Sequence, residues 1–202
     1  MKTFKCFILF LSIAALLLIT AESAAAVRDA KQLSSEVFRL HVIADSDSND
    51  EQKLKLKVRD AILKETAEIF KEAKNATQAA EIADKNLLLI EEIAKKTVAE
   101  NGYSHDVKVS VRDSFFPTKS YENEVTLPAG VYSSLRVEIG SASGQNWWCV
   151  LFPQICLSTS LSESSVKKEM LSDSSRELAT GSKKGARVKF KIVEIINGLF
   201  GR

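Results

Sequence analysis

The stretch FRLHVIADSDSNDEQKLKLKVRDAI, from Phe38 to Ile62, puts a strand, a turn and a helix in immediate succession. Its first part belongs to Glu36–Asp45, which is rich in β-branched and large apolar residues and predicts a buried strand. Ser48 and Glu51 have the spacing of a capping box, which predicts that a helix begins after Ser48. Apolar residues then recur near helical spacing, so this helix is expected to continue to Lys74.

The rest of the domain changes from helix to strand. A second helix is predicted from about Thr77 to Glu100, and Asn101-Gly102 ends it because glycine accepts the left-handed backbone after a helix. Alternating or continuous apolar residues then predict strands at Val107–Arg112, Ser133–Ile139 and Asn146–Phe152. The expected fold class is α+β, with one strand, two long helices and three or more mostly antiparallel strands in a domain over residues 36–157.

Residues 1–26 have the three parts of a secretory signal peptide. Lys2 and Lys5 precede an apolar run, and Ala24-Ala25-Ala26 offers a cleavage site between Ala26 and Val27. The alternative is an uncleaved membrane anchor, for which about 20 apolar residues are needed. Residues 27–35 are expected to form a polar lead-in to the domain.

The charge of the chain is nearly balanced, with a formal net charge of +2, which argues against a nucleic-acid partner. Residues 158–182 are rich in serine and predict a flexible linker. Residues 183–202 hold six basic residues and one acidic residue, with an apolar stripe at helical spacing. This C-terminal amphipathic segment is expected to dock on an anionic membrane surface or on a partner, to fold back on the domain, or to remain disordered; Val188, Phe190 and Ile192 could alternatively alternate as a strand.

The acidic turn Asp45-Ser46-Asp47-Ser48 imitates two kinds of site. An EF-hand would need glycine and glutamate where Asp50 and Leu56 stand. A phosphotransferase with Asp45 as nucleophile and Asp47 as acid/base would need a further acidic pair for the metal, and none is convincing. The simpler interpretation is that these residues and Glu51 turn the backbone and cap the helix.

Few other residues offer chemistry. The chain has only two histidines, His41 and His105. Cys149 could serve as a nucleophile with one of them, but its apolar neighbours would disfavour a thiolate. We therefore expect no catalytic residue, no metal site, no cofactor and no small-molecule substrate.

The segment GQNWWCVLFPQIC, Gly144 to Cys156, contains both tryptophans of the chain. On a strand, Trp147 and Trp148 point to opposite faces, so at least one of them is left for a second layer, a partner or water. The candidate partner-binding residues are Trp147, Trp148, Phe152 and Pro153. Cys149 and Cys156 are either bridged across a turn at Pro153 or are two buried free thiols.

Three blocks together resemble the stage II sporulation protein R family of endospore-forming Firmicutes. They are Phe38–Ile62, SFFPTKSYENEVTLPAGVY (Ser114–Tyr132) and NWWCVLFPQIC (Asn146–Cys156), in the family's order. This chain differs at Ala44-Asp45-Ser46-Asp47-Ser48, where the family usually has ANSDS. The amide that commonly replaces Asp45 argues further against a phosphotransfer nucleophile.

The resemblance implies a signalling protein and not an enzyme. Such a protein is secreted from the forespore into the space between forespore and mother cell. It is needed there to activate a membrane-embedded aspartic protease of the mother cell, stage II sporulation protein GA, which converts pro-sigma-E to active sigma-E. A secreted cell-envelope hydrolase and a structural envelope protein are the alternatives.

Overall fold

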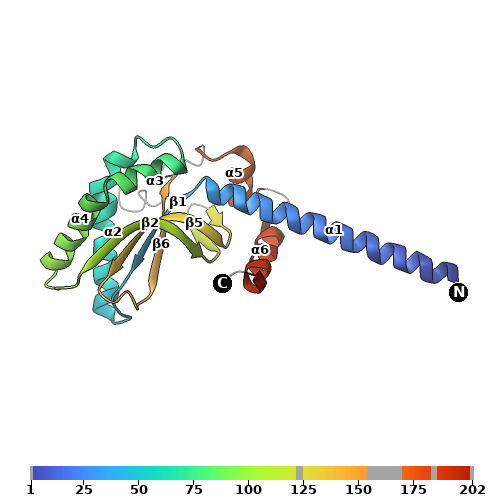
Figure 1. The fold of residues 1–202 in the computed structure, drawn as a ribbon, viewed down its shortest axis with the longest axis horizontal. Coiled ribbons are helices and arrows are strands. Elements are labelled where there is room, and N and C mark those ends of the chain that lie inside the picture. The colour runs from blue at the N-terminus through green and yellow to red at the C-terminus, as the bar shows by residue number, and fades with distance from the viewer. Residues whose placement is uncertain (1, 122–124, 154–169, 183–185, 201–202) are drawn as a thin grey trace.

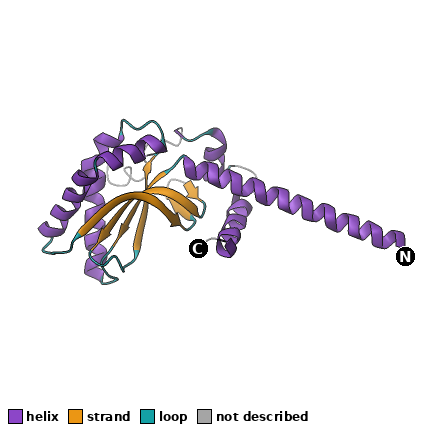
Figure 2. Ribbon diagram, in the orientation of Figure 1, coloured by secondary structure: helices purple, strands orange, loops and turns teal. Residues whose placement is uncertain are grey.

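A four-stranded sheet with helices on one face forms the body of the protein (Figure 1). The computed structural model describes residues 2–121, 125–153, 170–182 and 186–200. The sheet consists of β1 (Phe38–Ile43), β2 (Val107–Phe116), β5 (Gly130–Ile139) and β6 (Asn146–Phe152), in the order β2-β5-β1-β6. Only β1 and β5 run parallel; the other two neighbouring pairs are antiparallel. The predicted α+β class with a mostly antiparallel sheet is confirmed (Figure 2).

The core lies between the sheet and three helices, α2 (Asn49–Phe70), α3 (Ala76–Lys85) and α4 (Leu87–Glu100). All six residues of β1 are buried, as expected for an interior strand. Phe38, Leu40 and Val42 belong to the same apolar cluster as residues of α2 and α4. Each such side chain contributes about 1.5–3 kcal/mol through burial, so the helix-facing side of β1 is the centre of the fold.

Helix α2 begins where the capping box predicts. Ser48 has an extended backbone, and its side-chain oxygen accepts a hydrogen bond from the backbone N–H of Glu51 at 3.3 Å. The carboxylate of Glu51 makes its hydrogen bond to His105 instead of completing the box. The start of the helix is therefore confirmed, and the reciprocal half of the capping box is replaced by a long-range contact.

The second predicted helix is two helices, which corrects the sequence-based boundary. The break lies at Asn86, whose backbone leaves the helical conformation at φ −113° and ψ 17°. Its side-chain amide donates to the carbonyl oxygen of Ile82 at 2.7 Å, so it competes with the helix for backbone partners. The predicted stop after Glu100 is confirmed, because Gly102 has a φ of 82°.

A short hairpin was missed by sequence reasoning. Strands β3 (Lys119–Tyr121) and β4 (Val125–Leu127) pair antiparallel in a separate two-stranded sheet. Val125 and Leu127 are buried, and the hydroxyl of Tyr121 accepts a hydrogen bond from the guanidinium of Arg39 in β1. The hairpin therefore packs onto the face of the main sheet that the helices leave open.

The N-terminal helix α1 (Lys2–Ser35) runs through the predicted cleavage site without a break. Its first part is exposed and projects from the body (Figure 1), whereas Ala26, Ala30 and Leu33 are buried. Residues 27–35 are thus helical and packed, not a polar lead-in, because the spacing of three or four residues puts their small and apolar side chains on one face. The segment Cys6–Ser35 is long and apolar enough to cross a membrane, a property that signal sequences share.

The described part of the predicted linker is folded. Residues 170–182 contain helix α5 (Asp173–Ala179), which Ser172 caps through its side-chain oxygen. Leu171, Leu178 and Ala179 are buried. Serine is common in linkers but is also a preferred helix cap, so composition alone misassigned this half of residues 158–182.

The C-terminal segment is helix α6 (Ala186–Phe200), and it packs beside α1 (Figure 1). Phe190 and Val193 are buried, and Lys189 forms an ion pair with Asp29 of α1 at 2.6 Å. Asn197 donates to the carbonyl oxygen of Ala129 at 3.0 Å. Of the arrangements considered for this segment, the structure has a helix that folds back, mainly onto α1.

Candidate functional site

The two tryptophans lie on opposite faces of β6, the last strand in the order of the described sheet. On the helix side, the guanidinium of Arg59 in α2 lies 4.4 Å from the ring centroid of Trp147. On the open side, the ring of Trp148 lies 6.3 Å from His41 and 6.4 Å from Phe116. Trp147 is 36% exposed, whereas Trp148 is half-buried, and its Nε1–H has no acceptor in the part of the chain that the structure describes. Both indoles therefore remain candidates for contact with a partner.

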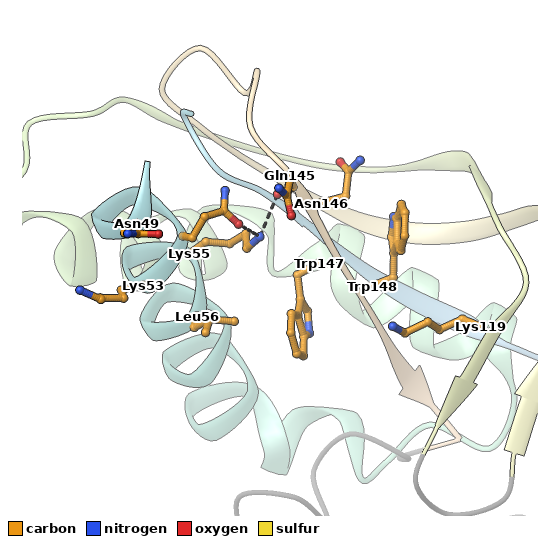
Figure 3. Close-up of a pocket in the computed structure, with 10 residues that line it drawn as sticks. Asn49, Lys53, Lys55, Leu56, Lys119, Gln145, Asn146, Trp147 and Trp148 are labelled. Atoms are coloured by element: carbon orange, nitrogen blue, oxygen red, sulfur yellow. Dashed lines mark hydrogen bonds between the residues drawn. The ribbon is translucent and has the colours of Figure 1, made fainter. Parts of the chain in front are cut away.

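A groove of about 520 Å³ lies beside the start of β6 (Figure 3). Helix α2 forms one wall, the start of β6 with both indoles forms another, and Lys119 of β3 reaches it from the hairpin. Within the part of the chain that the structure describes, its lining contains no carboxylate and consists of Asn49, Gln52, Lys53, Lys55, Leu56, Lys119, Gln145, Asn146, Trp147 and Trp148. The groove is therefore cationic and aromatic.

Lys55 is the most deeply placed of the three lysines, with 4% of its surface exposed. Its ammonium donates to the side-chain oxygen of Gln52 and, at 2.9 Å, to the carbonyl oxygen of Gln145. Burial lowers the pKa of Lys55, and the field of Asp47 opposes that effect. Among the residues that the structure describes, no carboxylate lies within ion-pair distance of this ammonium. Sequence reasoning gave no sign of this buried cation, because the pattern of α2 suggested only an amphipathic helix.

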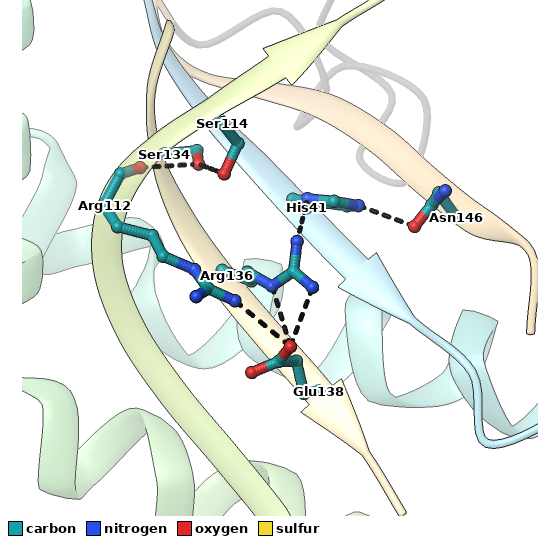
Figure 4. A network of polar contacts seen from close by, with 7 residues as sticks. All are labelled: His41, Arg112, Ser114, Ser134, Arg136, Glu138 and Asn146. Carbon is teal, nitrogen blue, oxygen red and sulfur yellow. Dashed lines mark hydrogen bonds and ion pairs between the residues drawn. The ribbon is translucent and has the colours of Figure 1, made fainter. Parts of the chain in front are cut away.

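The open face of the sheet carries a polar network next to the groove (Figure 4). Arg136 donates to Glu138 at 2.7 Å and approaches Nδ1 of His41 at 3.4 Å. Nε2 of His41 lies 2.7 Å from the side-chain oxygen of Asn146, so it carries the proton in this arrangement. Burial lowers the pKa of His41, although the hydrogen bond to Asn146 opposes this. His41 is thus a neutral connector between β5, β1 and β6.

At the other end of the open face, aromatic side chains surround Arg39, which is fully buried. Its guanidinium lies over the rings of Phe116 and Tyr132, at 3.9 Å and 4.9 Å from their centroids. It donates to the hydroxyl of Tyr121 at 2.5 Å, while its Nη1 has no hydrogen-bond partner among the described residues. Burial lowers the pKa of Arg39. This cage is a structural support for the hairpin beside the groove.

The acidic turn holds the loop between β5 and β6. The carboxylate of Asp45 accepts from the backbone N–H of Ser141 at 2.7 Å, and that of Asp47 accepts from Gln145 N–H at 2.6 Å. The Ser141 N–H lowers the pKa of Asp45. Gly144 lies so close to the turn that a Cβ there would be 2.3 Å from the carbonyl oxygen of Ser46. The turn therefore positions the loop that leads into β6, as well as capping α2 through Ser48.

A contact between Glu51 and His105 was not expected from the sequence, since 54 residues separate them. Nε2 of His105 lies 2.8 Å from Oε1 of Glu51, and Tyr103 stacks on the imidazole. Asp45 lies nearby, and one potential ligand atom from each of Asp45, Glu51 and His105 falls within 4.8 Å of the others. One oxygen of Asp45 and one of Glu51 are already engaged in hydrogen bonds, so the observed role of the group is to tie the turn to the end of α4.

The remaining predicted site residues fall in different places. Phe152 and Pro153 are buried at the end of β6, so these two predicted partner-binding residues do not belong to an exposed contact surface. Cys149 is buried in β6, whereas Cys156 lies outside the described residues, so the bridge remains a prediction. Ala26 is buried inside α1 against Val193, and Val27 is exposed.

Comparison with known proteins gives the family. The model of the family described as "Stage II sporulation protein R (spore_II_R)" matches residues 34–162. The chain belongs to the stage II sporulation protein R family. It is also 31% identical to "Stage II sporulation protein R" of Bacillus subtilis (strain 168) over 217 residues, covering 96% of each chain. No solved structure matches. Membership of the stage II sporulation protein R family assigns the protein to sporulation.

The three sequence blocks that carry the family resemblance meet at the groove. The block Phe38–Ile62 forms β1, the acidic turn and the lysine-bearing wall of α2. The block Ser114–Tyr132 contributes the hairpin with Lys119, and the block Asn146–Cys156 begins with β6 and the two indoles. Segments far apart in this member of the stage II sporulation protein R family thus come together on one surface.

Proposed function

We propose that this protein is a secreted sporulation signal that activates the membrane-embedded aspartic protease of the mother cell, so that pro-sigma-E is processed to sigma-E. The observation that carries the proposal is the family match, which covers the whole sheet and its three helices. The long apolar helix α1 is compatible with a signal peptide or a membrane anchor, and a signal peptide would direct the chain to secretion. The space between forespore and mother cell is the proposed location.

The site geometry supports a binding role over a hydrolytic one. Both carboxylates of the acidic turn accept backbone N–H groups, which is a structural use of these side chains. Cys149 is buried in the sheet, and His41 is held between Arg136 and Asn146. The exposed face of Trp147 and the cationic groove offer a surface for a partner protein.

The test is a reconstitution with the protease and its substrate. Membranes that contain the protease and pro-sigma-E are mixed with the purified protein, and appearance of the shorter sigma-E is followed by immunoblotting. We expect cleavage that depends on the added protein. Cleavage of pro-sigma-E without the added protein, or no cleavage in its presence, would contradict the proposed activation.

One variant distinguishes a signalling function of this protein from a hydrolase activity. Asp45→Asn keeps an oxygen that accepts the Ser141 N–H, so a signalling protein should retain activation. A hydrolase that used the Asp45 carboxylate would lose its activity. Asp84→Asn, at an exposed position of α3, is the matched control.

A further inference from the structure

We propose that Asp45, Glu51 and His105 bind one divalent transition-metal ion, Zn²⁺ or an ion of similar chemistry. Glu51 lies in the first turn of α2, directly after the turn that contains Asp45, and His105 lies in the loop between α4 and β2. The inference goes beyond the proposed function, because it assigns the chain a ligand that signalling does not require. It also replaces the expectation from the sequence that the chain has no metal site.

The three side chains hold their donor atoms close to the spacing of a metal site. One potential ligand atom from each residue lies within 4.8 Å of the other two. Nε2 of His105 lies 2.8 Å from Oε1 of Glu51. Donors bound to one zinc ion at about 2.0–2.2 Å are roughly 3.3–3.6 Å apart in a tetrahedron. Small side-chain rotations would therefore bring these atoms to the required spacing.

Glu51 provides an independent reason for a cation. The residue is only 9% exposed, and its Oε2 is buried without a hydrogen-bond partner in the residues that the structure describes. A carboxylate oxygen that loses its water without gaining a partner destabilises the folded state. The contact with His105 uses only Oε1, so this pair alone leaves the second oxygen unsatisfied. A bound cation would supply the missing partner.

Neighbouring groups hold the other two ligands in place. The carboxylate of Asp45 accepts the backbone N–H of Ser141 at 2.7 Å, and the ring of Tyr103 stacks on the imidazole of His105 at a centroid distance of 5.5 Å. Metal-binding carboxylates and histidines are usually fixed by such second contacts. Asp45 and His105 are both partly exposed, so an ion reaches the site from solvent and keeps a water ligand there.

The donor set selects the class of ion. Calcium and magnesium prefer ligand sets made entirely of oxygen, whereas an imidazole nitrogen suits zinc and other transition metals. Two carboxylates balance the charge of a divalent ion, and three protein ligands leave the fourth position of tetrahedral zinc for water. To bind, Nε2 of His105 gives up the proton that faces Glu51, either to Nδ1 or to water.

An ion at this place would brace the loop that leads into β6. Asp45 is already tied to that loop through Ser141, and His105 brings in the loop between α4 and β2. The unfolded chain does not hold these ligands together, so the ion binds mainly to the folded state and stabilises it. We expect the unfolding temperature to rise by about 5–10 °C when free zinc exceeds its Kd a hundredfold.

The first test is a titration of the metal-free full chain with zinc, followed by NMR of its two histidines. His41 is an internal control, because it lies elsewhere on the sheet between Arg136 and Asn146. We expect saturation at one zinc ion per chain, with the imidazole signals of His105 shifted and those of His41 unchanged. Absence of saturable binding, or binding that leaves the His105 signals in place, would overturn the proposal.

An exposed thiol is the main competitor for zinc. Cys6 is free and exposed, so Cys6→Ser is titrated in parallel. We expect the same stoichiometry and affinity as for the unaltered chain. Loss of zinc binding in Cys6→Ser would assign the ion to that thiol and overturn the proposed site.

Variants of the ligands locate the ion. Glu51→Gln and His105→Gln each remove one ligand but keep a group that can form a hydrogen bond at the same place, so both should fold. Each should weaken zinc binding at least about tenfold, the loss found even for groups that only support a ligand. Asp106→Asn removes a neighbouring exposed carboxylate outside the set and should bind zinc like the wild type. The two ligand variants lie in different elements, so one folded variant with wild-type affinity is enough to refute the site.

The metal site and the signalling function are tested separately. Asp45→Asn should bind zinc more weakly and still promote cleavage of pro-sigma-E, because the family usually has an amide at this position. Wild-type zinc affinity of this variant would overturn the three-residue site, whatever the result for cleavage. A wild-type chain that binds zinc as expected but does not activate the protease would support the site and contradict only the proposed function.

Discussion

The guanidinium carbon of Arg39 lies 3.9 Å from the ring centroid of Phe116, and no carboxylate of the described residues pairs with it. The cation is held by aromatic faces, a phenolic hydroxyl and the carbonyl oxygen of Cys149 at 3.4 Å. Cation–π contacts are worth about 2 kcal/mol or more when water is excluded. The cage therefore joins β1, β2, β5 and the β3–β4 hairpin on the open face.

Removing the hydroxyl of Tyr121 should destabilise the protein. Tyr121→Phe leaves the Nη2 of Arg39 without its acceptor, so we expect a loss of about 1–3 kcal/mol in the free energy of unfolding. Urea denaturation followed by circular dichroism measures it. Tyr103→Phe is the control, because it keeps the ring that stacks on His105. An unchanged stability in Tyr121→Phe would show that the hydroxyl does not support the cage.

Local signals explain what the sequence could predict. Ser48 is a helix cap because of the three residues that follow it, and Gly102 ends a helix because of its own backbone freedom. The strand Asn146–Phe152 follows from its apolar run. Each of these depends on neighbours along the chain, so no tertiary information was needed.

Long-range pairs explain what the sequence could not. Lys55 meets Gln145 across 90 residues, and Arg39 meets Tyr121 across 82. Nothing local marks either cation as buried, because lysine and arginine are ordinarily surface residues. The helix break at Asn86 and the cap at Ser172 were missed for a different reason, since asparagine and serine occur in helices, caps and loops alike.

Removing the Asp45 carboxylate should lower the stability of the folded protein at pH values above the range in which this carboxyl titrates, and not below that range. The Ser141 N–H lowers the pKa of Asp45 in the folded protein, so the stabilisation is complete above the unfolded pKa of about 3.9 and is lost as pH falls through the folded pKa. Asp45→Ala should therefore be less stable than wild type at pH 7, with the difference shrinking in acid. Chemical denaturation at both ends of that range tests this. A difference independent of pH would mean that ionisation of Asp45 plays no part.

Cleavage between Ala26 and Val27 should give a secreted protein that keeps the packed end of α1. Asp29, Ala30 and Leu33 lie beyond the cleavage site, so their contacts with the rest of the molecule would survive. N-terminal sequencing of secreted material should begin at Val27. A sequence beginning at Met1 would identify α1 as an uncleaved anchor.

The Cys149–Cys156 bridge should form in the secreted protein. Closing so short a loop contributes about 2.5 kcal/mol on the loop-entropy model, less any strain. The mass of the intact protein should rise by two hydrogens on reduction. Cys6 is removed with the first 26 residues, so it does not contribute a thiol to the secreted protein. Two thiols that react with an alkylating agent in the unreduced, unfolded protein would therefore rule the bridge out.

Truncation after Gly181 should lower stability, because α6 is packed and not merely attached. Phe190 and Val193 are buried against the rest of the fold, and the Lys189–Asp29 pair is largely shielded from water. Phe190→Ala alone should cost about 3 kcal/mol, whereas Val188→Ala, at a side chain that is 63% exposed, should cost almost nothing. Thermal unfolding of the truncated form and both variants measures this, and vesicles of anionic lipid measure binding in parallel. If truncation left the unfolding temperature unchanged and abolished vesicle binding, α6 would be a membrane anchor and its contacts with α1 would contribute little to stability.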